Sequence, residues 1–480
     1  MSTILSAQDV RFRSAWLDLS LLRWELLAPS WRSRYEYLVA QEEVSHYEKD
    51  WLFFLARDFL SLQGVAHFSD EAWSEYRSSE YKGIALRGGH VWPSPSEAVS
   101  ALTGLVSALE ETLKRARAAQ PLDKSTLHRL VEKFLGRPAA LRKEALNGPI
   151  PQKVVSPNDV EAALSTLLED IQSQTAAGVS PIWVAAWAHH ALTQIRPYAD
   201  GNARAALLVS QYVLWRAGLP GFVLKPFQRI PYYTALQAAD SGDLRPWAQL
   251  FLEGLQQATL YALSWGYAGK RSYEESISAF NRRFSGWRSR HDRDRSQRIM
   301  NNRYTVFDYM EEILRQVANE LDEKLKVEEG RGTRALVAKA YPDSPYYYQF
   351  TTDIVEYARK NGYYLNRGLP RGWFKIKFSL SASKKYQLVF SLHHAGHDDA
   401  TLAVGALLHF LEPLKYRRRR LRQRKNRREK VVYLFAPLSF STSPLTFSIE
   451  NVSPSVRTLL REYVQQNLEK ALIELVNEIY

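Results

Sequence analysis

One nine-residue stretch carries the side chains best suited to chemistry on a phosphate. It reads Arg-Pro-Tyr-Ala-Asp-Gly-Asn-Ala-Arg, from Arg196 to Arg204. A short Gly-Asn turn that opens a helix points several backbone N–H groups at one spot, where the helix dipole adds partial positive charge. An arginine in the first turn can pair with a phosphate oxygen. We therefore predict a phosphate site formed by Gly201, Asn202, Ala203 and Arg204.

The two ends of this loop bear on what the site could do. Asp200 precedes the turn and could hold a magnesium ion that bridges phosphates. The first residue, Arg196, stands where a group able to take up a proton would be expected, and arginine stays protonated in proteins. An ordinary turn between two helices, with Asp200 as a cap and Arg204 on the surface, fits the same residues.

Two helices must position the loop. The stretch 180–195 begins with Ser-Pro and is apolar nearly all round, which is typical of a helix at the centre of a bundle. A second central helix is expected from Ala203 onward, ending at Gly218 with Pro220 behind it. The stretch 156–171 predicts an amphipathic helix beside them, because its apolar residues form one stripe.

With these flanks, the sequence resembles the Fic/Doc (Fido) family. The pattern of that family is His-x-Phe-x-Asp/Glu-Gly-Asn-Gly/Lys-Arg, against residues 196–204 here. The stretch 127–144 resembles the part that precedes the β-flap of the family, and 229–251 its closing helices. The resemblance covers about residues 95–265. It implies an all-α helical bundle whose members transfer AMP, or another phosphate-containing group, from a nucleotide to a hydroxyl of a target protein.

The resemblance implies a role for each matching position. ATP, or another nucleotide, and Mg²⁺ would be the cofactors. Asp200 would hold the magnesium ion. Gly201, Asn202 and the N-terminus of the following helix would bind the α- and β-phosphates, and Arg204 would bind a phosphate oxygen. Tyr198 would replace the phenylalanine that anchors the loop.

Besides Tyr198, three positions depart from the family pattern. Arg196 replaces the histidine that acts as general base, a loss that typically costs ~10²–10⁴-fold in rate. Ala203 replaces glycine or lysine, and Leu207 replaces the second arginine of many members. His189 and His190 lie upstream in the central helix, where we expect packed or capping histidines rather than a relocated base.

A second kind of site is indicated by the basic segment 415–430. It holds eleven Lys/Arg and one acid, which is +10 of the net charge of +13. Such a segment repels itself without counter-anions, so we weigh a polyanion partner, most simply nucleic acid, against a solvated loop. The candidate contacts are Arg417, Arg418, Arg419, Arg420, Arg422, Arg424, Lys425, Arg427 and Arg428.

A cluster of histidines and aspartates invites a metal interpretation. His393, His394, His397, Asp398 and Asp399 follow a predicted strand. Histidine and aspartate at these offsets could ligate zinc or manganese. We favour a capped turn, in which the aspartates cap a helix expected over residues 400–413.

Composition limits the remaining classes of function. The chain has 480 residues and no cysteine, which excludes disulfides, thiol nucleophiles and zinc–thiolate sites. Neither a secretory signal nor an apolar run of ~20 residues is seen, so a cytoplasmic protein without a membrane span is expected. Nothing in the sequence predicts the oligomeric state.

The predicted fold class is mainly α with a C-terminal α+β domain. We expect a helical N-terminal region over 1–90, the Fic-like domain over 95–265, a charged helical connector over 266–330, and an α+β domain with an antiparallel sheet over 331–480. Period-two alternation in 373–380 and 386–392 predicts two of its strands, and 431–438 and 445–450 are two further candidates.

Three hypotheses about function follow. The first is a nucleotide- or phosphate-binding pseudoenzyme or scaffold, which has lost its base and meets a partner through the basic C-terminal domain. The second is an active protein adenylyltransferase, or a related phosphotransferase, with a relocated base. The third is a nucleic-acid-binding protein in which the Fic-like domain is purely structural.

Overall fold

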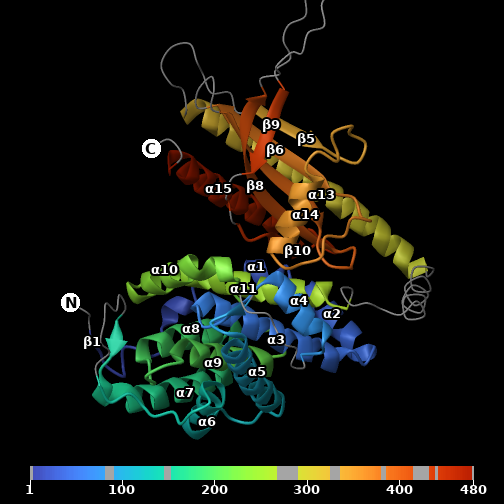
Figure 1. Cartoon of the computed structure of the whole chain (residues 1–480). Helices are drawn as coiled ribbons and strands as arrows, with labels where there is room; N and C mark the ends of the chain where they lie inside the picture. The colour runs from blue at the N-terminus through green and yellow to red at the C-terminus, as the bar shows by residue number, and fades with distance from the viewer. Residues whose placement is uncertain are drawn as a thin grey trace, which may run out of the picture. The chain divides into compact units, whose positions relative to one another are not determined.

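The computed structural model of the chain describes residues 4–81, 91–144, 153–266, 290–324, 336–379, 385–414, 432–437, 440 and 442–477 (Figure 1). The chain divides into two compact units. One consists of Met1–Trp24 and Ser33–Ala262, and the other of Glu25–Arg32 and Leu263–Tyr480. The finer division of the first 265 residues into a helical N-terminal region and a separate Fic-like domain stays a prediction.

The first unit is built almost entirely from helices. Its longer elements are α3 (Val44–Gln63), α4 (Asp70–Ser78), α5 (Pro95–Arg117), α6 (Lys124–Leu135), α7 (Val160–Ala176), α8 (Pro181–Ile195), α9 (Asn202–Arg216) and α10 (Arg229–Asp240). Three-residue 3₁₀ turns lie at Ser14–Trp16, Pro157–Asp159 and Pro226–Gln228. The bounds of α1 (Leu22–Glu25), α2 (Ala28–Ala40) and α11 (Arg245–Ser264) include residues of both units.

Helices α8 and α9 form the centre of this unit. Every residue of α8 from Ile182 to Ile195 is buried, and α8 packs along α9, which also packs against α5. Both predicted central helices are confirmed, with Pro181 in the first turn of α8 and Gly218 at a φ of 69° after α9. Proline needs no N–H partner in a first turn, and glycine tolerates the left-handed backbone that ends a helix.

Short extended segments tie the helices of this unit together. β1 (Ile4–Leu5) pairs in parallel with β4 (Val154–Val155), and β2 (His67–Phe68) pairs antiparallel with β3 (Val91–Trp92). An isolated bridge also joins Leu141 to Tyr198, inside the predicted site loop. The chain before β4 is therefore fastened to the loop by backbone hydrogen bonds.

The second unit contains a six-stranded antiparallel sheet among its described residues. Its strands are β5 (Leu336–Ala340), β6 (Gly372–Ser379), β7 (Lys385–His394), β8 (Thr401–Leu414), β9 (Val432–Pro437) and β10 (Leu445–Ser448). The strand order is β10-β8-β7-β6-β5, with β9 also paired to β8. The described helices of this unit are α13 (Arg290–Lys324), α14 (Thr351–Lys360) and α15 (Pro454–Asn477).

The two faces of the sheet pack against different helices. On one face, Phe390 meets Tyr463 of α15, with ring centroids 6.5 Å apart, and α13 packs against α15 and the strands β5 and β6. On the other face, α14 packs on β8, where the ring of Tyr357 lies against Gly405. The expected fold class, mainly helical with a C-terminal antiparallel sheet, is confirmed.

One secondary-structure prediction for this unit is wrong. Residues 400–413 were expected to form a helix, and they form most of the strand β8. The stretch is rich in alanine and leucine, which favour helices in isolation. In the folded unit, however, β8 pairs with β7 along one side and with β9 and β10 along the other. These ladders, and burial from both faces, override the local propensity.

Among the described residues, no helix is long and apolar enough to cross a membrane.

Candidate functional site

The predicted phosphate loop connects the two central helices of the first unit. Helix α8 ends at Ile195, and the next residue, Arg196, has a φ of 44° and a ψ of 63°, which place it in the left-handed region. The side chain of Asn202 then closes the loop, because its Oδ1 accepts from Tyr198 N (2.9 Å) and its Nδ2 donates to Tyr198 O (2.7 Å). The amide of Asn202 therefore shapes the loop at the position where α9 begins.

Gly201 is required at its position for two reasons. Its φ is +79°, a backbone conformation that residues with a Cβ rarely adopt. An added Cβ would also lie 2.6 Å from Cε2 of Phe134 on α6. The ring of Phe134 thus leaves no room for a side chain at position 201. The same ring packs against Arg204, whose guanidinium carbon lies 4.7 Å from the ring centroid.

Asp200 is surrounded by positive charge. Its Oδ1 accepts from Gly201 N at 2.6 Å, and its Oδ2 lies 3.3 Å from Nη2 of Arg204 and 3.8 Å from Nη2 of Arg137. The side chain of Arg204 is only 8% exposed, whereas that of Asp200 is 56% exposed. Burial lowers the pKa of Arg204, and the charge of Asp200 opposes that shift. The acid of the loop thus serves as a partner for buried and exposed arginines.

Arg196 is half-buried and turns toward α8. Its Nε donates to the carbonyl of Thr193 at 3.3 Å. Burial lowers the pKa of Arg196, and the charge of Asp240 opposes this. Because the ordinary pKa of arginine lies so far above neutrality, the guanidinium stays charged and has no lone pair with which to accept a proton. The sequence prediction that this residue cannot act as a base rests on that chemistry.

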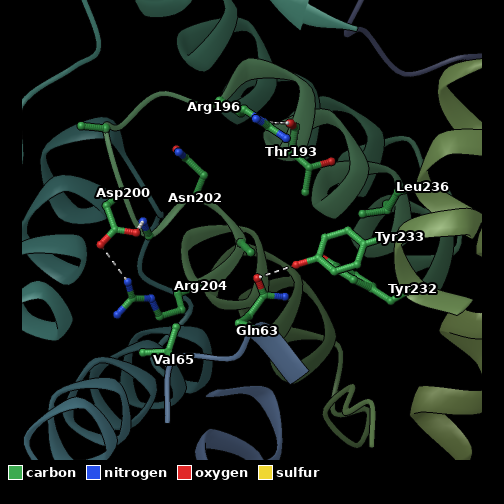
Figure 2. Close-up of a pocket in the computed structure, with 13 residues that line it drawn as sticks. Gln63, Val65, Thr193, Arg196, Asp200, Asn202, Arg204, Tyr232, Tyr233 and Leu236 are labelled. Carbon is green, nitrogen blue, oxygen red and sulfur yellow. Dashed lines mark hydrogen bonds and ion pairs between the residues drawn. The ribbon is translucent and has the colours of Figure 1, made fainter. Parts of the chain in front are cut away.

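A cavity of about 310 Å³ opens beside the loop. In Figure 2, Arg196 lies at the top, Arg204 at the lower left and Asn202 between them, while Tyr232 and Tyr233 of α10 form the opposite wall. Tyr233 donates to Oε1 of Gln63 at 3.4 Å. The cavity is lined by Gln63, Val65, Thr193, Arg196, Ala199, Asp200, Gly201, Asn202, Ala203, Arg204, Tyr232, Tyr233 and Leu236.

The lining shows which chemistry the cavity supports. All five residues predicted for the phosphate and metal roles, Asp200 to Arg204, line it together with Arg196. Among the described lining residues, Asp200 carries the single carboxylate and the two arginines carry the positive charges. Two guanidinium groups beside a helix start make a receptor for an anion such as a phosphate group.

His189 and His190 are fixed inside the protein. Ser210 donates to the carbonyl of Ala206, so its oxygen accepts from Nδ1–H of His189 (3.0 Å). The Nε2 of His189 consequently accepts from the hydroxyl of Tyr232, at 2.9 Å. Burial lowers the pKa of His189 to about 3, so the ring is neutral.

His190 is equally committed, with its Nε2 2.8 Å from Oδ1 of the buried Asp240. Neither histidine is among the described residues that line the cavity. The packed-histidine interpretation therefore describes both, and neither is placed to take a proton from a hydroxyl in the cavity.

Sequence reasoning missed Arg142, which holds the loop in place. Its guanidinium donates to four carbonyls, those of Arg196 (3.1 Å), Glu144 (3.1 Å), Val155 (2.7 Å) and Ile195 (3.3 Å). Its backbone N–H donates to Pro197 O at 2.8 Å. Arg142 thus joins the end of α8 to β4 and to the residues that precede β4. No motif marks it, because its role depends on carbonyls from segments far apart in the sequence.

The histidine–aspartate cluster of the second unit forms a capped turn. Asp398 accepts from Ala400 N (3.0 Å), Thr401 N (2.8 Å) and the hydroxyl of Thr401 (3.0 Å), and Asp399 pairs with Arg295. The turn precedes the strand β8 instead of the expected helix.

The histidines of the cluster point to separate partners. His393 bonds Tyr363 (2.7 Å), and His394 accepts from Arg303 (2.8 Å). These two are neighbours on a strand, so they face opposite sides of the sheet. His397 stacks on Tyr364. No group of three potential metal ligands occurs in the part of the chain that the structure describes.

The basic segment 415–430, with all its candidate contacts, lies outside the described residues. Its attachment points are described, since β8 ends at Leu414 and β9 begins at Val432, and these two residues are paired. The polyanion interpretation of this segment stays a prediction.

Part of the chain is similar to the Fic/DOC family. The Fic/DOC family model matches residues 121–214, which include α6 to α9 and the site loop. The protein adenylyltransferase Fic of Drosophila persimilis is 32% identical over 109 residues, 23% of this chain and 21% of that protein. The protein adenylyltransferase fic-1 of Caenorhabditis elegans is 35% identical over 95 residues, 20% of this chain and 19% of that protein. The chain thus spans about a fifth of these curated relatives.

Solved structures give the same family name at lower similarity. A Fic domain-containing signaling protein from Bacteroides thetaiotaomicron is 18% identical with a TM-score of 0.41, over 48% of this chain and 96% of the other. Fic-1 from C. elegans is 19% identical with a TM-score of 0.37, over 49% of this chain and 71% of the other. The similarity to the Fic/DOC family over residues 121–214 rests on the sequence match.

Proposed function

Because residues 121–214 form a Fic/DOC family domain with distant homology to protein adenylyltransferases, we propose that the cavity beside α9 binds the phosphates of a nucleotide. We propose further that this domain does not transfer the nucleotide by the base-assisted route. The protein then acts as a nucleotide-binding pseudoenzyme, which presents a bound or empty site to a partner. ATP is the nucleotide that the family resemblance favours.

The observation that carries the proposal is the position of Arg196. It lines the same cavity as the retained residues of the phosphate loop, at the place in the motif where the family has its general base. A permanent cation there attracts a phosphate but cannot remove a proton from an incoming hydroxyl. The same cavity therefore offers groups that can bind a phosphate and lacks the general base at position 196.

The alternative of a relocated base finds little support around the cavity. Asp200 is the single carboxylate of the described lining, and it is paired with Arg204 and Arg137. His189 and His190 are buried and already hydrogen bonded. The phenol of Tyr232 donates to His189, which would have to accept a second proton if Tyr232 were to act as a base through it.

Binding of ATP by the full-length protein tests the receptor half of the proposal. We expect Arg204→Gln to weaken ATP binding by about tenfold or more, since it removes a charged partner of the phosphates. Arg216→Gln, at the exposed far end of α9, is the matched control and should bind as the unaltered protein does. Absence of ATP binding, or equal affinity in both variants, would reject a phosphate receptor at this loop.

The protein partner in this proposal is taken from the names of the relatives, which are protein adenylyltransferases. A hydroxyl-bearing segment of a target protein would approach the open side of the cavity, where Asp200 is more than half exposed. A cytoplasmic location is part of the same proposal.

A further inference from the structure

The magnesium ion implied by the family fits the described residues poorly. Mg²⁺ takes six oxygen ligands in a near-octahedral arrangement, usually one or two free carboxylates together with waters and substrate phosphates. Asp200 carries the single carboxylate among the described lining residues, and both of its oxygens have hydrogen-bond or ion-pair partners. The amide oxygen of Asn202, Oδ1, accepts from the backbone N–H of Tyr198, and that of Gln63, Oε1, accepts from the hydroxyl of Tyr233. A metal would have to take Asp200 away from Arg204 and Arg137.

The net charge of the cavity lining also disfavours a divalent cation. Arg196 and Arg204 contribute two positive charges to the lining and Asp200 contributes one negative charge, which leaves a formal +1. A neutral histidine at position 196, as in the family pattern, would leave zero. A divalent cation therefore meets more repulsion in this chain than in one that keeps the base, whereas a phosphate group meets more attraction.

We propose that this site binds a nucleoside phosphate without a divalent cation. The permanent positive charge of Arg196 would neutralise negative charge on the phosphates, which a metal ion otherwise does. The inference rests on the proposed function, since it concerns the same cavity. The forked guanidinium groups of Arg196 and Arg204 approach the cavity from different sides (Figure 2), and each can donate two N–H groups to phosphate oxygens.

Asp200 has a different role in this arrangement. It holds the buried guanidinium of Arg204 while the site is free of ligand, at 3.3 Å. An incoming phosphate then competes with Asp200 for Arg204 instead of sharing a metal ion with it. Neutralising Asp200 should consequently leave phosphate affinity unchanged or increase it, which is the opposite of what loss of a metal ligand would cause.

Equilibrium dialysis of ATP against the full-length protein tests the inference. The measurement is made at about pH 8, where an ordinary histidine is neutral, with either MgCl₂ or EDTA at matched ionic strength. The dissociation constant of the unaltered protein should differ by no more than about threefold between the two conditions. No variant is needed for this first comparison, so a folding defect cannot obscure it.

Three variants sharpen the result. Arg196→His should weaken binding in EDTA by about tenfold or more, and MgCl₂ should recover part of the loss. Asp200→Asn, which keeps an oxygen for the N–H of Gly201, should bind ATP as tightly as the unaltered protein or more tightly. Arg216→His is the control, because it makes the same substitution on α9 away from the cavity, and it should change nothing.

Two results would overturn the inference while leaving the proposed function intact. One is binding by the unaltered protein that needs magnesium, with affinity at least about tenfold weaker in EDTA. The other is a loss of similar size in Asp200→Asn, which would identify a metal ligand. Absence of ATP binding under every condition would reject the proposed function itself and this inference with it.

Discussion

At the scale of single residues, the loop between α8 and α9 depends on side chains that cannot be exchanged freely. A Cβ at position 201 would collide with the ring of Phe134, the guanidinium of Arg204 lies over the same ring, and Arg204 in turn pairs with Asp200. The amide of Asn202 closes the loop on Tyr198 with two hydrogen bonds. A change at one of these positions therefore moves charges that line the cavity.

Comparing Gly201→Ala with a second glycine-to-alanine variant separates the clash with Phe134 from the strain of the left-handed backbone. Gly178→Ala is the matched control, because Gly178 has a φ of +75° with no atom within 4 Å of an added Cβ. It should cost about 1–2 kcal/mol of unfolding free energy from the left-handed backbone alone. Gly201→Ala should cost at least about 1 kcal/mol more, because its Cβ meets Phe134. Urea denaturation measures both, and equal losses would contradict the role given to Phe134.

His189 should make the protein sensitive to acid. Burial lowers its pKa to about 3 in the folded state, whereas the unfolded chain takes up the proton near pH 6.5. Its stabilising contribution is thus complete above about pH 6.5 and is lost as the pH falls, because the unfolded state then binds more protons.

The difference in unfolding free energy between the unaltered protein and His189→Gln isolates this residue from the other histidines. As the pH falls below 6.5, the unaltered protein should lose up to about 1.4 kcal/mol per pH unit more than His189→Gln does. A difference that stays constant between about pH 7 and pH 4 would show that His189 takes up its proton in the folded state at the same pH as in the unfolded chain, which would contradict the lowered pKa.

At the scale of elements, one arginine fastens the end of α8 to β4. Arg142 donates to carbonyls before β4, within β4 and at the end of α8, and the backbone bridge between Leu141 and Tyr198 reinforces this connection. Helix C-terminal carbonyls lack partners within the helix. Arg142 provides partners for two of them and so fixes the direction in which Arg196 leaves α8.

Replacement of Arg142 by methionine should therefore be far more damaging than loss of an exposed arginine. We expect it to cost about 2–4 kcal/mol, because several buried carbonyls lose a charged donor. Arg245→Met is the comparison: Arg245 forms an exposed pair with Asp243, and exposed ion pairs contribute little to stability because water screens them. Thermal and urea unfolding would measure both variants. Equal and small effects would contradict the role assigned to Arg142.

The elements also show how far the sequence predicts the structure. The helices α8 and α9 follow from their apolar patterns and from Pro181 and Gly218, which are local signals. The strand β8 could not be distinguished from a helix by composition, because only its partners in the sheet determine its conformation. Arg142 carries no signal for a similar reason: it is one of 64 lysine and arginine residues, and its carbonyl partners come together only in the fold.

The sequence predicts which residues form the site, but not how their side chains are paired with one another. The motif identified Asp200 to Arg204 and the replacement at Arg196, and these residues do line one cavity. That Asp200 is paired with Arg204 and Arg137, and that Asn202 is used inside the loop, depends on distances that spacing does not supply.

At the scale of the whole molecule, the basic charge is concentrated far from this cavity in the sequence. Residues 415–430 carry +10 of the total +13 and connect the paired residues Leu414 and Val432. We predict that this segment binds nucleic acid through phosphate contacts. Changing Arg417, Arg418, Arg419 and Arg420 to glutamine should weaken binding to a DNA duplex and lower the salt slope by up to about 3–4.

The control for that prediction is Lys360→Gln, an exposed cation at the end of α14 in the same unit. It should change neither the affinity for the duplex nor its dependence on salt concentration. Fluorescence anisotropy over a series of salt concentrations measures both quantities. A slope unaffected by the four changes would leave the basic segment without a role in nucleic-acid binding.

The central claim is that the first unit has kept a nucleotide receptor and lost its base, and one measurement tests it most directly. Purified protein is incubated with α-labelled ATP and magnesium, alone and with cell lysate, and compared with Arg196→His. The account predicts no transferred label with the unaltered protein and transferred label once histidine stands at position 196. Label transferred by the unaltered protein and abolished by Arg204→Gln would contradict it, and so would the absence of label from both proteins.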